Sequence, residues 1–348
     1  MNQTLKQIIQ FLFFASIGAF ILYMLYKSQS EKYLEDCLSR GNEPGDCSLL
    51  TKLFEDFRSC NWWWLLTILF IYLISNVLRT WRWQMLIRPL GYLPTFKNGF
   101  MAIMIGYFAN LGVPRLGEML RAGLYSKYDK VPLEKTLGTI VTDRIMDVLC
   151  LLIFILVTLP FTFGPVTGYI EENLMIKEKL MSINLGLVLL VAVAVAVIFV
   201  LILKSKAFQQ SAVASKVKSL LIGFKDGLIS VRKIDSVPRF IFYSIGIWVC
   251  YYLMTYLTFY AFEPTAHLGP LEGLLVFIFG TLGILFPSPG GMGSYHFMVM
   301  EALSIFKIDS IESFSFANII YFAIMLFGNV IFGILSLILL PILNRDKA

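Results

Sequence analysis

Long apolar runs alternate with short polar segments along almost the whole chain. Six of these runs are long enough to cross a bilayer, which takes about 20 helical residues. They lie near residues 8–27, 61–80, 137–160, 183–203, 240–262 and 316–341. The pattern predicts an all-α polytopic membrane protein with six full transmembrane helices, in which residues 1–348 form a single integral membrane domain.

Two further apolar stretches are interrupted near their centres. Residues 98–131 contain "NLGVPRLGEMLR", and residues 272–306 contain "FPSPGGMGSYH". Pro and Gly break helices, and each interruption leaves roughly half a span on either side. We therefore expect each stretch to enter the membrane and return to the same face, as a re-entrant helical hairpin.

The charge of the connecting segments supports this arrangement. Lys and Arg are enriched in cytoplasmic segments. Residues 79–97 hold four Lys/Arg and no acid, and residues 204–239 hold eight against two, whereas residues 27–60 hold five against seven. If both broken stretches are re-entrant and the N-terminus is cytoplasmic, every segment falls on the side that its charge prefers. We expect a protein of the cytoplasmic membrane with both termini in the cytoplasm.

The two halves follow the same order with opposite membrane sense. Residues 61–160 form a first repeat with a cytoplasmic-entry hairpin at 98–131, and residues 240–341 form a second repeat with an outer-entry hairpin at 272–306. Residues 1–60 supply the first helix and an extracytoplasmic loop, and residues 161–239 supply a fifth-segment helix and a basic cytoplasmic loop. The pattern predicts an inverted repeat whose two breaks meet near the midplane and line a cavity.

Composition agrees with a membrane protein. The 348 residues are 57% hydrophobic and 15% charged, whereas a soluble domain is about a quarter charged. The net charge of +6 is explained by cytoplasmic loops, so we expect no nucleic-acid partner. The apolar run at 8–27 is longer than a signal-peptide core and lacks a small-residue cleavage site, so we expect it to be retained.

The five cysteines show no spacing typical of a metal site. Neither a CxxC pair nor a Cys/His ligand set is present, so we expect no metal and no cofactor. Cys37, Cys47 and Cys60 share the segment expected outside, where a disulfide would persist, and a Cys37–Cys47 bond is the preferred pairing.

Charged residues at the first break should be costly in a bilayer, at about 2.5 kcal/mol or more each, unless they are paired or hydrated. Three cations and three anions fall in this break and in the helix that follows, which suits a buried and balanced network: Arg115, Arg121, Arg144, Glu118, Asp143 and Asp147. Two alternatives are that Arg121 and Arg144 extend to the cytoplasmic interface, and that the ion pairs serve structure alone.

The second break would bind a ligand through backbone amides rather than through charged side chains. Its glycines, Gly290, Gly291 and Gly293, precede a new helix N-terminus, where free amides attract anions. His296 follows, and it is either a functional group or an ordinary hydrogen-bonding histidine. Together with Asn110, Pro114, Arg115, Glu118 and Arg121 of the first break, these residues are the candidate substrate-binding residues.

At these residues the chain resembles the transmembrane region of the lysylphosphatidylglycerol synthase/flippase family. The likeness rests on "NLGVPRLGEMLR", "TDRIMDVL" and "PSPGGMGSYH", in that order, and covers about residues 60–340. It implies a lipid-translocating protein with two opposed re-entrant hairpins. Members with a synthase carry a soluble aminoacyl-transfer domain after the membrane part; here the chain stops at Ala348, so that activity is not implied. Family sequences often have an acid shortly after the second glycine motif, where His296 stands here, which leaves open whether the head group is a cationic aminoacyl lipid.

The leading hypothesis is a flippase-like transporter, not an enzyme, that moves a membrane phospholipid or polyprenyl-linked lipid with a phosphate-containing head group. A gradient or downhill movement would drive it. The alternative is an intramembrane polyprenyl-pyrophosphate or lipid phosphatase. A third reading is a non-catalytic protein that organises other membrane proteins. The protein partners we consider are a second copy of the chain and a lipid-modifying enzyme.

Overall fold

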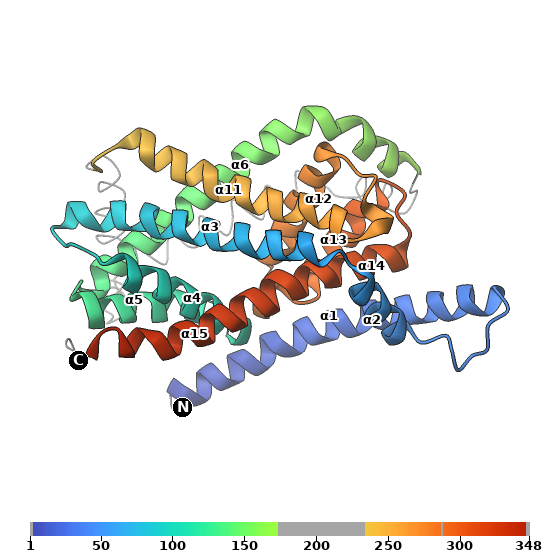
Figure 1. Cartoon of the computed structure of the whole chain (residues 1–348), viewed down its shortest axis with the longest axis horizontal. Coiled ribbons are helices and arrows are strands. Elements are labelled where there is room, and N and C mark those ends of the chain that lie inside the picture. Colours follow the sequence, from blue (N-terminus) through green and yellow to red (C-terminus); the bar gives the residue numbers. More distant parts are fainter. Residues whose placement is uncertain (1–2, 114, 173–233, 287, 346–348) are drawn as a thin grey trace, which may run out of the picture.

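The described residues of the computed structural model, 3–113, 115–172, 234–286 and 288–345, are helical and contain no strand (Figure 1). The α-helices are α1 (Gln3–Ser39), α2 (Leu49–Ser59), α3 (Trp62–Ile87), α4 (Phe96–Gly112), α5 (Leu116–Asp129), α6 (Leu133–Glu172), α11 (Val237–Ala261), α12 (Pro270–Leu285), α13 (Ser294–Ser304), α14 (Ser310–Ile320) and α15 (Asn329–Ile342). Short 3-10 turns lie at η1 (Arg88–Leu90), η2 (Glu263–Thr265) and η3 (Pro289–Gly291), and a π-helix, η4 (Tyr321–Gly328), joins α14 to α15.

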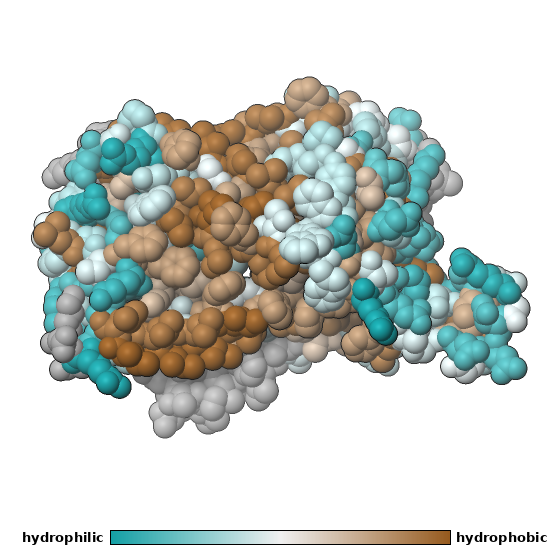
Figure 2. Space-filling view, in the orientation of Figure 1, coloured by the Kyte–Doolittle hydropathy of each residue, from teal (hydrophilic) through white to brown (hydrophobic). Residues whose placement is uncertain are grey.

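Four helical segments of the described chain are long and apolar enough to span a membrane: Trp62–Leu90, Leu133–Tyr169, Val237–Ala261 and Ser310–Ile342. They contain or largely overlap four of the predicted spans. The predicted span 8–27 lies within α1, and the predicted span 183–203 lies outside the described residues. Figure 2 shows apolar residues across the middle of the molecule and hydrophilic residues towards both ends. This distribution is that of an integral membrane protein.

Three helices extend beyond the predicted spans. Helix α1 continues to Ser39 and α2 follows, so most of the predicted extracytoplasmic loop is helical. Helix α3 continues to Ile87, and α6 continues through Pro160 and Pro165 to Glu172. Helical hydrogen bonding satisfies the backbone in these extensions as it does in the spans. The hydropathy pattern marks where an apolar run stops, not where the helix stops, so the predicted helix ends fall too early.

Each broken stretch forms a tight pair of helices. Gly106 of α4 lies against Gly117 of α5 so closely that a Cβ on Gly117 would overlap the Gly106 carbonyl oxygen. In the second pair, a Cβ on Gly283 of α12 would lie 2.8 Å from the carbonyl oxygen of Ser294 at the start of α13. Figure 1 shows α4 and α5 in one half of the molecule and α12 and α13 in the other.

The order of helices recurs along the chain. Helices α3, α4, α5 and α6 begin at residues 62, 96, 116 and 133, and α11, α12, α13 and α14 begin at residues 237, 270, 294 and 310. The close-contact positions repeat with one spacing, because Gly283 follows Gly106 by 177 residues, as Ser294 follows Gly117. The described chain thus repeats one order of four helices.

Helix α3 packs against α11 more extensively than any other described pair of elements, and α4 packs against α15. Gly246 of α11 allows the first contact, since Leu78 lies 3.1 Å from where its Cβ would be. The short helix α2 is fixed by Asp56, a buried carboxylate that accepts hydrogen bonds from Lys52 and from Ser315 of α14. Close backbone approach and a few polar anchors thus complete the bundle.

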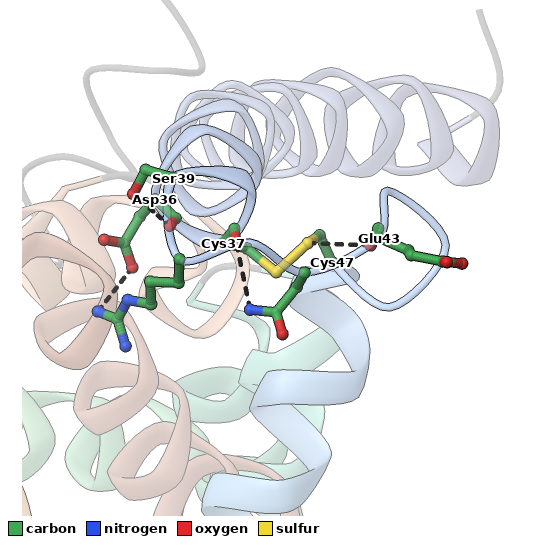
Figure 3. Close-up of a disulfide and its surroundings, with 7 residues drawn as sticks. Asp36, Cys37, Ser39, Glu43 and Cys47 are labelled. Atoms are coloured by element: carbon green, nitrogen blue, oxygen red, sulfur yellow. Dashed lines mark hydrogen bonds and ion pairs between the residues drawn. A yellow bond between two sulfur atoms is a disulfide. The ribbon is translucent and has the colours of Figure 1, made fainter.

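A disulfide joins the end of α1 to the loop before α2 (Figure 3). Cys37 and Cys47 have a Cα–Cα distance of 5.8 Å, within the usual range for a disulfide. The loop is further held by the amide of Asn42, which donates to the Cys37 carbonyl at 3.1 Å. Cys60, Cys150 and Cys250 are free and buried.

Candidate functional site

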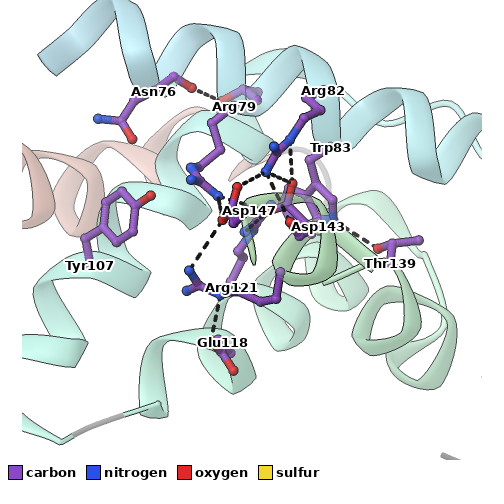
Figure 4. A network of polar contacts seen from close by, with 12 residues as sticks. Asn76, Arg79, Arg82, Trp83, Tyr107, Glu118, Arg121, Thr139, Asp143 and Asp147 are labelled. Atoms are coloured by element: carbon purple, nitrogen blue, oxygen red, sulfur yellow. Dashed lines mark hydrogen bonds and ion pairs between the residues drawn. The ribbon is translucent and has the colours of Figure 1, made fainter. Parts of the chain in front are cut away.

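Two arginines of α3 converge on two aspartates of α6 (Figure 4). Arg79 lies 3.1 Å from Asp143 and 2.9 Å from Asp147, and Arg82 lies 2.6 Å from Asp143 and 2.7 Å from Asp147. The side chains of both arginines and of Asp143 are almost fully buried. The two helices present these groups together because residues three and four apart share a helix face.

Helix α5 adds a third guanidinium to Asp143. Arg121 lies 3.2 Å from an Asp143 oxygen, and its guanidinium lies 3.7 Å from the ring centre of Trp83. The indole of Trp83 is fixed in turn by donating to the Thr139 hydroxyl at 3.0 Å. Nε and Nη2 of Arg121 are buried and have no hydrogen-bond partner in the described part of the chain. Arg121 therefore faces inward and does not extend to the membrane surface.

Arg144 is the most accessible arginine of the network. Its Nε donates to Glu118 at 3.0 Å, and Nη1 lies 3.7 Å from Asp147. The side chains of Arg144 and Glu118 are 42% and 32% exposed, far more than those of Arg79, Arg82 and Arg121. Arg144 thus retains donors that can be offered to a ligand.

The network differs from the predicted set in two respects. Arg79 and Arg82 belong to it, although the sequence places them in a basic cytoplasmic segment. Arg115 does not belong to it: this residue is exposed, has φ of +67° as the N-cap of α5, and forms no ion pair with any described residue. Four arginines therefore face three carboxylates, and the expected balance of charge becomes an excess of one positive charge.

A cavity of about 380 Å³ lies beside this network. Arg79, Arg144 and Asp147 form its charged part, and Asn110, Tyr107 and Tyr251 add polar groups. The Tyr251 hydroxyl lies 3.0 Å from Arg79 Nη2 and 3.5 Å from the Tyr107 hydroxyl. The remaining wall is mostly aliphatic and aromatic, from α3, α6, α11, α12 and the α14–η4 segment. A mainly apolar pocket with a few convergent polar groups is the usual form of a small-molecule site.

The tips of the two hairpins meet at this cavity. Leu111 of α4 and Gly290 of η3 both line it, and a Cβ on Gly290 would lie 3.0 Å from Leu111 Cδ2 and 3.1 Å from the Tyr321 hydroxyl. Asn110 stabilises the first tip by accepting a hydrogen bond from the Gly117 amide at 2.8 Å. Pro114 of the first tip lies outside the described residues.

The second tip is shaped by its glycines. Gly290, Gly291 and Gly293 have φ of +58°, +76° and +79°, a region that glycine adopts without steric penalty. Only Gly290 of the three lines the cavity. His296 is 1% exposed and packs behind the wall, with its ring 4.7 Å from that of Tyr321. The structure thus places His296 against the lining residue Tyr321 and Arg121 against Asp143 and Trp83, and neither His296 nor Arg121 lines the cavity.

Sequence reasoning missed four polar residues of the site: Arg79, Arg82, Tyr107 and Tyr251. One signal was available for the arginines: residues 79 and 82 continue the apolar run of the second predicted span and are three apart, so they share a helix face, as Asp143 and Asp147, four apart, do. Because Arg79 and Arg82 are counted among the charges of a cytoplasmic segment, their shared helix face is not recognised. The tyrosines had no such signal, since aromatic residues are abundant throughout the chain.

Comparison with known proteins identifies the family of the chain. The family model for the lysylphosphatidylglycerol synthase transmembrane region matches residues 48–333. The chain belongs to this family. It is also similar to the UPF0104 membrane protein MJ1595 of Methanocaldococcus jannaschii, with 22% identity over 276 residues that cover 74% of this chain and 80% of that protein. No solved structure matches. The family resemblance read from the sequence is thereby confirmed.

Proposed function

We propose that this family member translocates a lipid with a phosphate-containing head group across the cytoplasmic membrane, through the cavity between its two hairpins. The observation that carries the proposal is the cationic end of an otherwise apolar cavity, where Arg79 and Arg144 belong to a network with four arginines and three carboxylates. A phosphate would supply the missing negative charge.

The repeated helix order supports an inverted repeat. In this proposal, α4–α5 is the hairpin that enters from the cytoplasm and α12–α13 is the hairpin that enters from outside, with both chain termini in the cytoplasm. The contact of their tips at Leu111 and Gly290 then lies near the membrane midplane. Movement of one repeat against the other would expose the cavity alternately to the two sides.

Arg144 has the role of contacting the head group directly, because it lines the cavity and keeps free donors. Arg79 supplies a second positive charge and Asn110 a side-chain amide. Arg82, Arg121 and Asp143 position these groups from behind. Glu118 holds Arg144 in place and competes with a bound anion for its guanidinium.

Translocation of fluorescent lipids in proteoliposomes tests this function. Vesicles would contain the wild type, Arg144→Gln or Arg144→Lys, with head groups that do and do not carry phosphate. Phosphate-dependent translocation by the wild type should be lost in Arg144→Gln and partly kept in Arg144→Lys, since lysine keeps the charge without the planar fork. Arg115→Gln is the matched control, because Arg115 is exposed and does not line the cavity, and it should behave as wild type.

Absence of translocation for every lipid would contradict the proposal. The same vesicles would then be supplied with polyprenyl pyrophosphate and assayed for phosphate release, which is the reaction of the alternative phosphatase. A second copy of the chain and a lipid-modifying enzyme remain predicted partners.

A further inference from the structure

The cavity has a second polar end, formed by a tyrosine and an amide. Tyr72 of α3 and Asn329 of α15 both line the cavity, and the Tyr72 hydroxyl donates to Asn329 Oδ1 at 2.6 Å. Both side chains are buried. Tyr72 precedes Arg79 by two turns of α3, which places the two positions about 10 Å apart along the helix axis. The amide end is therefore separate from the arginines of the charged end.

The Asn329 amide keeps a donor for a ligand. In the described part of the chain, Nδ2 has one hydrogen-bond partner, the sulfur of Met325 at 3.7 Å. A thioether is a weak acceptor, and a buried amide N–H without a strong acceptor is unfavourable. An oxygen atom of a ligand at this end of the cavity would satisfy it.

Hydroxyl groups connect the two ends. The Tyr251 hydroxyl lies 3.0 Å from Arg79 Nη2 and 3.5 Å from the Tyr107 hydroxyl. Tyr107 and Tyr251 in turn interact electrostatically with Tyr72. The three tyrosines come from α4, α11 and α3, and all of them line the cavity. A row of uncharged polar groups thus runs from Arg79 to Asn329.

The charged end has no carboxylate to spare for a cation. Asp147 is the one acid among the described residues that line the cavity, and it lies 2.9 Å from Arg79 and 2.7 Å from Arg82. Arg144 approaches the same carboxylate to 3.7 Å. An ammonium group in the cavity would meet two lining arginines, and like charges repel. An uncharged substituent meets no such repulsion.

An alcohol has the chemistry that matches the row, because a hydroxyl both donates and accepts hydrogen bonds. A phosphate at the charged end cannot itself bond to Asn329, since a hydrogen bond spans about 3 Å and the two ends are about 10 Å apart. Only a substituent carried by the phosphate can occupy the amide end.

From these observations we infer that the cavity selects a lipid whose phosphate is esterified to an uncharged polyol. The phosphate lies at Arg79 and Arg144, and the hydroxyls of the polyol lie along the tyrosines to Asn329. This inference rests on the proposed function and names the class of head group. It disfavours an ammonium-bearing or aminoacylated head group.

Binding of short-chain lipids to the purified protein tests the inference without any transport step. Dihexanoyl phosphatidylglycerol would be compared with dihexanoyl phosphatidylpropanol, which has the same charge and carbon number but no free hydroxyl. The rise in Tm with lipid concentration gives each Kd. One or two hydrogen bonds should make phosphatidylglycerol bind about tenfold more tightly. Phosphatidylethanolamine, which carries an ammonium group, should bind more weakly than phosphatidylpropanol.

Removal of both polar partners at the amide end should abolish this preference. Tyr72→Phe combined with Asn329→Leu leaves neither partner unpaired, and such paired replacements are often well tolerated. The variant should bind phosphatidylglycerol only as well as phosphatidylpropanol, whose own affinity should not change. Tyr252→Phe is the matched control, because its hydroxyl donates to the Pro270 carbonyl at 2.9 Å and does not line the cavity. If the double variant does not fold, Tyr72→Phe alone should reduce the preference.

Equal wild-type affinity for phosphatidylglycerol and phosphatidylpropanol would overturn the inference, as would a preference that survives in the double variant. Phosphatidylinositol separates two kinds of polyol: tighter binding than phosphatidylglycerol assigns the subsite to a sugar-like ring, and weaker binding assigns it to a glycerol chain. If the polyol is preferred but no lipid is translocated, the subsite stands and the transport function falls. If lipid is translocated with no difference between glycerol and propanol head groups, the reverse holds.

Discussion

In hairpin α4–α5 the helices touch at Gly106 and Gly117, and in hairpin α12–α13 they touch at Gly283 and Ser294, 177 residues later in each case. The surroundings of the two pairs differ. The first hairpin contributes Arg121 and Glu118 to an ionic network, whereas the second contributes a glycine turn and the aromatic wall of Tyr295.

The same spacing of 177 residues can be applied to the residues of the ionic network. The residues that follow Arg79, Asp143 and Asp147 by 177 positions are Tyr256, Ile320 and Ile324. One backbone plan therefore carries charge in one half and apolar packing in the other. The charged residues that line the cavity, Arg79, Arg144 and Asp147, all come from the first half.

Asp143→Asn should lower stability more than the other substitutions, because it removes the carboxylate shared by three buried arginines of the first half. Asp143 pairs with Arg79, Arg82 and Arg121 in a fully buried environment. Removal of one partner from a buried ion pair costs about 3–5 kcal/mol. Thermal unfolding of the purified protein in detergent should show a large drop in Tm. The control Asp235→Asn, whose side chain is 64% exposed and 3.9 Å from Arg88, should not shift it.

Substitution of the contact glycines compares the hairpins directly. Gly117→Ala forces a Cβ into the Gly106 carbonyl oxygen, whereas Gly283→Ala places it 2.8 Å from that of Ser294. Overpacking typically costs about 1–3 kcal/mol, and we expect Gly117→Ala to be the more destabilising. Gly123→Ala, with nothing within 4 Å of its Cβ, should gain about 0.5–1 kcal/mol. Equal shifts in Tm for Gly117→Ala and Gly283→Ala would mean that the hairpins are equally tight.

The two tips should respond in opposite directions to a change at positive φ. Gly290→Ala adds a Cβ at φ of +58°, and the left-handed region costs a non-glycine residue about 1–2 kcal/mol. Arg115 already adopts φ of +67°, so Arg115→Gly should relieve strain of about the same size. Tm should fall in the first variant and rise in the second. A fall in both would show that Arg115 has a stabilising contact.

The smallest predicted effect concerns the thiol of Cys60. It lies near Asp56, a buried carboxylate outside the arginine network. Burial and the charge of Asp56 raise the pKa of the Cys60 thiol to about 11, from 9.0 for a free thiol. Any stability from the protonated thiol is therefore present below pH 9 and lost as the pH rises through 11. Maleimide should label Cys60 slowly at pH 9 and faster near pH 11, whereas Leu50→Cys, at an exposed position, should be labelled readily at pH 9. Rapid labelling of Cys60 at pH 9 would contradict the assigned environment.

Much of the helical plan could be predicted from the sequence. The apolar runs at 61–80, 137–160, 240–262 and 316–341 and the breaks at 98–131 and 272–306 correspond to described helices and hairpins, because hydrophobic length and Pro/Gly interruption are local properties. The partners of the charges could not be predicted in the same way. Arg144 pairs with Glu118 across two helices, and such pairing depends on the rotation of each helix about its axis.

The contrast between Arg115 and Arg121 shows the limit most clearly. Both lie in the same motif, six residues apart, and nothing in the amino-acid composition predicts which of the two is buried. The left-handed turn at Arg115 directs the chain so that this side chain is exposed, while Arg121 is buried against Trp83. The backbone break that made the motif conspicuous also decides which of its arginines enters the protein.

The π-helix η4 is a place where the cavity wall can lose a residue without disturbing the helices on either side. Its hydrogen bonds run from residue i to i+5, so it behaves as an α-helix that has accepted an extra residue. Tyr321, Ile324 and Met325 of this segment all face the cavity. Loss of one residue here would let the turn close as an α-helix while α14 and α15 keep their present faces. Loss of one residue within α3 would rotate every later side chain of that helix by about 100°. A deletion in η4 is thus a way to remodel the cavity wall while the surrounding bundle stays in register.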